Sequence, residues 1–186
     1  MAKAFQSDAV QGGIGSLVFP VLETATTADL IRDRMIACIL ALAPIDVLTA
    51  DRFHVHRDDE AQDFDSFIAE HPEASLRRFE VLPFGEEDTP RLTNCDVEER
   101  WQQFRVRVAY PATGRAGGTQ ARARDKMIDR DRDALELAIG LFSRPNFSSP
   151  YPDAVCTRWS PTRTRGKPCD VLEIETTMRF YRQLSH

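Results

Sequence analysis

The sequence predicts an α+β protein: a single two-layer domain in which two amphipathic helices cover one face of a twisted, mainly antiparallel sheet. Two segments repeat apolar residues at helical spacing, and several others alternate apolar and polar residues as half-buried strands do. Their order is helix, strands, helix, strands, without an internal repeat. A parallel sheet covered on both faces would instead read as nearly continuous apolar runs, so the pattern favours antiparallel pairing.

The first helix is predicted within residues 26–44. Thr26 or Thr27 can cap it, Asp29 lies in its first turn and Pro44 ends it. Arg32, Asp33 and Arg34 are expected to face solvent. An apolar stripe at helical spacing should cover the sheet or another helix, and it consists of Ile31, Met35, Cys38, Ile39 and Leu42.

Three strands and a helical turn are predicted before the second helix. Residues 52–59 form a short strand, residues 63–72 a helical turn, and residues 76–85 a strand with Phe79 and Val81 on its apolar face. Residues 99–111 form a longer strand with Arg105 and Arg107 facing outward. Its inward positions are Phe104, Val106, Val108 and Tyr110.

The second helix is predicted over residues 125–141 and follows a polar loop at residues 111–124. A short strand is predicted at residues 154–160, and a second polar loop at residues 160–169 follows it. Its outer face carries the sequence DRDRD, a pattern typical of a solvated surface. Its apolar stripe consists of Ile128, Leu135, Ala138, Ile139 and Phe142.

The closing strand, residues 171–182, has the strictest two-residue alternation in the chain. Glu173, Glu175 and Arg179 share its outward face. If it runs antiparallel to residues 99–111, then Glu173 and Glu175 can lie opposite Arg105 and Arg107, a favourable cross-strand match. Its inward positions are Leu172, Ile174, Thr176, Met178 and Phe180.

Length and composition fit one domain, because 186 residues can bury a single core. We expect a flexible N-terminal arm over residues 1–25 and one α+β domain over residues 26–186, with an insertion near residues 58–72. No apolar run is long enough to span a bilayer, and the start lacks the features of a secretory signal, so a cytoplasmic chain with four free cysteines is expected. The net charge of −5 argues against wrapping nucleic acid.

Two groups of side chains could carry metal chemistry. His54 and His56 alternate along a strand with Asp58 beyond them, so the three could hold zinc or iron in a small hydrolase, although an exposed edge strand explains the same residues. Asp170, Glu173 and Glu175 could hold magnesium in a nuclease, but no E-x-K arrangement follows and the strand pattern accounts for both glutamates. We expect no metal, no cofactor and no catalytic residue.

Arginines gather in the two predicted loops, where they could contact DNA or an acidic partner or simply keep the loops soluble. These arginines are Arg115, Arg122, Arg124, Arg163 and Arg165.

The arrangement of elements resembles the tail terminator proteins of long-tailed bacteriophages, over roughly residues 27–183. The similarity is carried by four segments: ADLIRDRMIACILAL, QFRVRVAYP, RDKMIDRDRDALELAIG and VLEIETTMRFYRQ. It implies a structural, non-enzymatic virion protein of the tail or neck, made in the host cytoplasm, that closes into a homo-oligomeric ring, usually a hexamer. Such a ring ends growth of the tail tube and offers a surface to the head-tail connector, while genomic DNA passes through its lumen.

On this interpretation a set of charged residues provides candidate contacts with neighbouring subunits or partner proteins. No membrane is expected among the partners. The alternatives are the small metal-dependent hydrolase and a binding module that adds a peptide to an open sheet edge. The candidate contact residues are Arg105, Arg107, Arg115, Arg122, Arg124, Glu173, Glu175 and Arg179.

Overall fold

The structure, a computed structural model, describes residues 28–42, 52–57, 60–85, 91–94, 97–112, 118–140, 154–166 and 168–183. The expected N-terminal arm lies outside these residues. The elements in chain order are α2 (Ala28–Leu40), β1 (His54–Val55), α3 (Phe64–Glu70), the 3-10 turn η1 (Pro72–Ala74), β2 (Arg78–Phe84), β3 (Arg91–Asn94), β4 (Val97–Pro111), α4 (Gly118–Gly140), β5 (Ala154–Thr164) and β6 (Cys169–Gln183).

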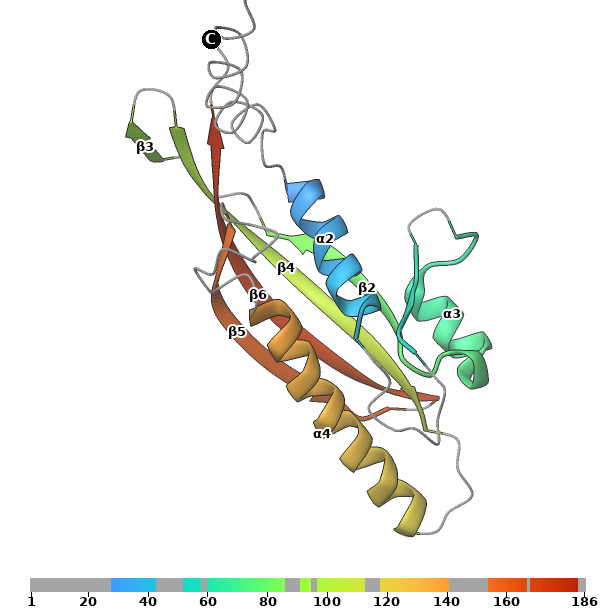
Figure 1. Cartoon of the computed structure of the whole chain (residues 1–186). Helices are drawn as coiled ribbons and strands as arrows, with labels where there is room; N and C mark the ends of the chain where they lie inside the picture. The colour runs from blue at the N-terminus through green and yellow to red at the C-terminus, as the bar shows by residue number, and fades with distance from the viewer. Residues whose placement is uncertain are drawn as a thin grey trace, which may run out of the picture.

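The strands form one sheet in the order β1-β2-β4-β6-β5, and β3 pairs with the beginning of β4. β1 runs parallel to β2, whereas every other pair is antiparallel. Figure 1 shows the long, twisted strands of this sheet with α2 and α4 in front of them. The predicted α+β class with a mainly antiparallel sheet is confirmed.

The closing strand of the sequence is β6, and it lies inside the sheet between β4 and β5. β4 and β6 pair along their whole length, from Val97 opposite Gln183 to Pro111 opposite Cys169. In this register Glu175 lies opposite Arg105. Glu173 likewise lies opposite Arg107, so the predicted strand pairing is confirmed.

The main core lies between the sheet and the two long helices. The predicted inward residues of β4 and β6 are buried, and the apolar stripes of both helices pack on them. Each fully buried aliphatic or aromatic side chain contributes roughly 1.5–3 kcal/mol relative to an exposed one. Phe142, predicted on the second stripe, lies outside the described residues. The helix residues of this core are Ile31, Met35, Ile39, Ile128, Leu135 and Ile139.

Helix α3 packs on the opposite face of the sheet, at the end where β4 finishes and β6 begins. Phe64 and Ile68 form a second cluster with Ala109 and Cys169. Asp63 caps the helix, since its Oδ1 accepts a hydrogen bond from the Ser66 amide at 2.9 Å. That bond lowers the pKa of the Asp63 carboxyl. The insertion expected near residues 58–72 therefore contains a helix that covers part of the second face.

The DRDRD segment of α4 is not wholly a solvated surface. Asp131 is fully buried, although its neighbours Asp129 and Asp133 are exposed. Its Oδ2 accepts a hydrogen bond from Arg77 Nε at 2.7 Å, and its Oδ1 accepts one from Arg77 Nη2 at 3.0 Å. The Tyr110 hydroxyl donates to Oδ2 at 3.0 Å. Asp131 lies three residues after Ile128 and four before Leu135, so helical spacing places it on the apolar stripe.

Several predicted boundaries are wrong. β1 covers only residues 54–55 of the segment 52–59. α4 begins at Gly118, so half of the predicted loop 111–124 belongs to the helix. β5 extends to Thr164 into the predicted loop 160–169, and β3 is an additional strand. Polar composition alone does not distinguish a loop from an exposed helical turn or an edge strand. Cys38, Cys156 and Cys169 are free thiols, as expected.

Candidate functional site

The sheet face opposite α2 and α4 carries a row of charged side chains, here called the charged face. β4 supplies Arg105 and Arg107, and β6 supplies Glu173, Glu175 and Arg179. These positions alternate with the core residues, so the two-residue period of a strand sends them all to the same side. They are half-buried, and α3 covers only the end of this face near Ala109.

The arginines of the charged face pair with carboxylates on neighbouring strands. Arg105 Nη2 donates to Glu175 Oε1 at 3.0 Å, and its Nε lies 3.3 Å from Glu173 Oε1. Arg179 Nη1 lies 3.6 Å from Glu99 Oε1. Because these pairs are partly exposed, each contributes little stability by itself, in the range of about 0–1 kcal/mol. Their main effect is to fix the orientation of the side chains.

An aromatic ring lies under each of three arginines on this face. The guanidinium carbon of Arg105 lies 4.6 Å from the centre of the Phe84 ring, and that of Arg179 lies 5.8 Å from the Trp101 ring. Arg107 lies 4.9 Å from the Phe64 ring of α3. Stacking on a ring adds about 0.5–1 kcal/mol at an exposed site. Arginine and tryptophan are also the side chains enriched at the centres of protein–protein interfaces.

Arg107 joins the charged face to α3. Its Nη1 donates to Glu80 Oε1 at 2.7 Å, and its Nη2 pairs with Asp65. Burial raises the pKa of the Glu80 carboxyl, and the nearby Arg107 charge opposes that rise. Glu80, expected to face outward, is buried beneath α3.

Five carboxylates, two on the charged face and three beside it, pair with its three arginines. Phosphate binding needs an excess of basic groups, so this surface suits contact with protein rather than with nucleic acid. The sequence pattern does not single out Phe84 as a contact. One feature of the sequence could have indicated these contacts: Phe84 and Trp101 alternate with the core residues of their strands, so they lie on outward faces that are otherwise mostly polar. The carboxylates concerned are Glu80, Glu99, Glu173, Glu175 and Asp65.

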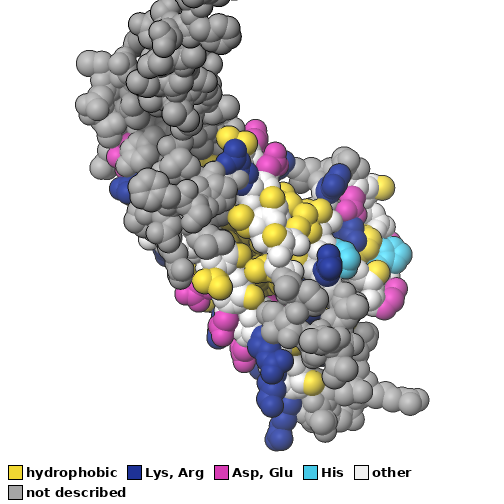
Figure 2. Space-filling view, viewed as in Figure 1, with side chains coloured by type: hydrophobic (Ala, Val, Ile, Leu, Met, Phe, Trp, Pro, Cys, Tyr) yellow, Lys and Arg dark blue, Asp and Glu magenta, His cyan; other side chains and the backbone are white. Residues whose placement is uncertain are grey.

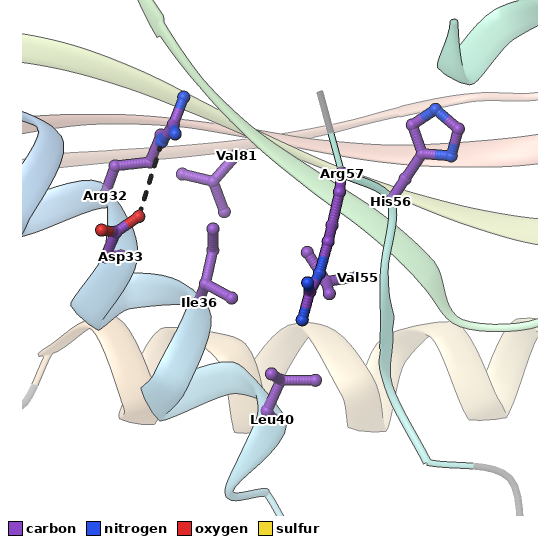
Figure 3. A pocket seen from close by; sticks show the side chains of 8 residues that line it. All are labelled: Arg32, Asp33, Ile36, Leu40, Val55, His56, Arg57 and Val81. Carbon is purple, nitrogen blue, oxygen red and sulfur yellow. Dashed lines mark ion pairs between the residues drawn. The ribbon is translucent and has the colours of Figure 1, made fainter. Parts of the chain in front are cut away.

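A second surface lies on the other side of the sheet, where α2 passes the outer border of β2. This α2–β2 groove is a cavity of about 420 Å³. In Figure 3, Ile36 points from α2 toward Val81, and Arg57 extends toward Leu40. Figure 2 shows hydrophobic side chains gathered on the surface around α2 and bordered by charged ones. The groove is lined by Arg32, Asp33, Ile36, Leu40, Val55, His56, Arg57 and Val81.

The histidines considered as alternative metal ligands do not converge. His54 is exposed, whereas His56 is buried and Asp58 lies outside the described residues. Arg78 Nε can only donate and lies 3.1 Å from His56 Nδ1, so Nδ1 accepts and Nε2 donates to the Gln62 carbonyl at 3.0 Å. Both ring nitrogens of His56 therefore have partners. Within the described residues no group of three His, Cys, Asp or Glu side chains could hold a metal ion.

The carboxylates considered for magnesium point to opposite faces of the sheet. Asp170 is buried on the helix side, where its Oδ2 accepts a bond from Arg163 Nη2 at 2.6 Å and lies 3.2 Å from Arg124 Nε. Glu173 and Glu175 belong to the charged face. The alternation of β6 separates the three, which contradicts a shared metal site.

The arginines predicted in two loops lie mostly on regular elements. Arg122 is exposed on α4, and Arg124 on the same helix pairs with Asp170. Arg163 belongs to β5 and bridges Asp125 and Asp170. These contacts tie α4 to the sheet, and they lower the pKa of the Asp125 carboxyl, mainly through the Arg163 hydrogen bond. Arg115 lies outside the described residues.

The sheet borders carry features that discourage strand addition. β2 has Pro83 beyond the short stretch that β1 covers, and β5 has Pro161 and an irregular register between Cys156 and Arg158. Proline lacks the amide donor that a ladder needs, and a bulge interrupts the row of bonds. Within the part of the chain that the structure describes, the faces of the sheet are therefore better contact surfaces than its edges.

Comparison with known proteins found no matching family model and no matching curated protein. Among the helices that the structure describes, none has the length and apolar character needed to cross a bilayer.

Proposed function

We propose that this chain is a structural subunit of a bacteriophage virion that forms a ring at the end of the tail tube. The ring ends tube polymerisation and presents a surface to the head-tail connector protein. Its partners are further copies of itself, in a hexamer, together with the tail tube protein and the connector. The subunit is made in the host cytoplasm and resides in the tail or neck of the virion.

The proposal is carried by the packing of the four elements whose sequences resemble tail terminators. α2 and α4 lie together on one face of the sheet, and the paired strands β4 and β6 form its centre. These elements belong to one core and so form a single subunit, which is consistent with the proposal.

The two surfaces described above support assembly into a ring. A closed ring of identical subunits uses a head-to-tail contact, in which one surface of each copy meets a different surface of the next. The charged face and the α2–β2 groove lie on opposite sides of the sheet and differ in chemistry. The first is mixed in charge, and the second has an apolar wall with charged residues at its border. Charge pairs at such a contact set orientation, and apolar contacts supply affinity.

The charge of the chain also fits a channel through which DNA passes. The net charge of −5 and the internally paired arginines leave no excess of basic groups on the charged face to hold phosphates. Arg105, Arg107, Arg122, Arg124, Glu173, Glu175 and Arg179 remain the proposed contact residues among those described, and Arg115 lies outside them.

Electron microscopy of the purified protein tests this function. Rings should form with increasing concentration, or on the ends of tubes assembled from the tail tube protein of the same phage, and tubes grown with the subunit present should be shorter. Bovine serum albumin at the same mass concentration is the control for crowding. Absence of rings in both settings, with tubes of unchanged length, would contradict the proposal.

A further inference from the structure

The α2–β2 groove is an apolar surface that the described residues leave partly open. Leu40 on its α2 wall is 41% exposed and is one of two exposed large apolar side chains among the described residues. Ile36 and Val55 are only partly buried. The charged side chains of Arg32, Asp33 and Arg57 border the groove, and Arg32 Nε lies 3.9 Å from Asp33 Oδ1, so Arg57 is the cation aimed at a ligand. The groove therefore fits an extended peptide with apolar side chains next to an acidic one.

The chain itself contains a segment of this chemistry. Residues 17–22 read LVFPVL, and Glu23 follows them directly. This segment precedes α2 and belongs to the 27 residues before Ala28, outside the described structure. Pro20 favours an extended backbone for the residue before it, which suits a peptide lying in a groove.

The lengths also match. The α2 wall runs from Arg32 to Leu40, a rise of about 12 Å along the helix axis. Six residues in extended conformation span up to about 20 Å. A segment of six residues, 17–22, is therefore long enough to follow the whole wall and to bring Glu23 to Arg57.

We propose that the α2–β2 groove binds residues 17–22 of a neighbouring copy of the chain. The inference rests on the proposed ring, because the ring supplies that neighbour. The apolar side chains of the segment cover Ile36, Leu40 and Val55, and Glu23 pairs with Arg57. This contact gives the ring the apolar affinity that the charged face lacks, since the arginines of that face are already paired within the subunit.

Photo-crosslinking with the full chain tests which copy fills the groove. An isotope-labelled copy with Leu40 replaced by benzoylphenylalanine is mixed with unlabelled protein under assembly conditions, irradiated and analysed by mass spectrometry. The expected product joins the labelled peptide around position 40 to an unlabelled peptide containing residues 17–22. The matched control carries the same group in place of Leu137, a leucine of α4 that is 55% exposed.

Crosslinks only within the labelled copy, no crosslink to residues 17–22, or an equal yield from position 137 would each overturn the inference. The substitution Leu40→Lys should raise the concentration needed for assembly about tenfold, because it puts a charge on the apolar wall, whereas Leu137→Lys should not. Equal effects of the two would also overturn it.

The outcomes separate this inference from the proposed function. Normal rings from a Phe19→Asp variant would refute groove binding and leave the ring intact. Crosslinks between copies, in a protein that never forms rings even with tail tubes, would support groove binding and refute the ring.

Discussion

The buried group formed by Arg77, Asp131 and Tyr110 offers the sharpest test of the fold. Replacing Asp131 with alanine removes the carboxylate that Arg77 contacts through two nitrogens, while the Arg77 side chain stays 2% exposed. Removing one partner of a buried ion pair costs about 3–5 kcal/mol, because an uncompensated charge remains inside the protein. The free energy of unfolding should fall by about that amount.

Urea unfolding followed by circular dichroism measures this change. For a chain of this size each kcal/mol corresponds to about 2–4 °C, so the melting temperature should fall by about 6–20 °C. The control is Asp133→Ala on the same helix, whose carboxylate is 70% exposed and should matter by no more than about 0.5 kcal/mol. A double-mutant cycle with Arg77→Ala should give a coupling of about 1–3 kcal/mol.

The reasoning would be refuted if Asp131→Ala and Asp133→Ala unfolded at the same urea concentration. It would also be refuted if the Arg77 and Asp131 substitutions were additive. In either case the contact between Arg77 and Asp131 would not stabilise the core as argued.

Four further predictions concern single features. Burial and the Asp131 carboxylate raise the pKa of Tyr110 well above its usual value of 10.0. The contribution of Tyr110 to the free energy of unfolding should therefore be fully present below about pH 10 and be lost as the pH rises toward the raised pKa. In urea unfolding at several pH values, Tyr110→Phe should reduce this alkaline loss. Reversing Arg105 to Glu should cost about 0.2–1 kcal/mol, and Glu175→Arg should recover part of it, whereas no recovery would argue against the observed register. Truncation before Val171 should abolish cooperative unfolding, because most of β6 is removed, and a soluble folded product would contradict that role. Equimolar zinc should leave the melting temperature unchanged, because both nitrogens of His56 have partners, and stoichiometric binding would count against this arrangement.

The fold class and the central strand pair could be predicted because their signals are local and periodic. Alternation along β4 and β6 fixes which side chains face the core, and the opposite charges of Arg105 and Glu175 favour the observed register. The stripes of α2 and α4 follow from helical spacing in the same way. Only the ends of these elements differ between the prediction and the structure, since capping and fraying depend on contacts beyond the local sequence.

The remaining features depend on contacts between distant segments. Asp131 looks like one more exposed acid until Arg77, 54 residues away, supplies its partner. His56 resembles a metal ligand until Arg78 and the Gln62 carbonyl occupy its ring nitrogens. Residue type alone cannot reveal such partners, because burial of a polar group is decided by the tertiary structure that satisfies it.

The position of β6 also governs when the protein can fold. β4 and β5 both precede β6 in the chain, and each must pair with it to complete the sheet. Arg105 and Glu175 are 70 residues apart, so the central pairing closes a long loop and is slow to form. Until β6 has been synthesised, β4 and β5 lack the strand that lies between them, and their apolar faces stay uncovered. The sheet should therefore form only after β6 has been synthesised, and a chain that stops before β6 should depend on chaperones to stay in solution.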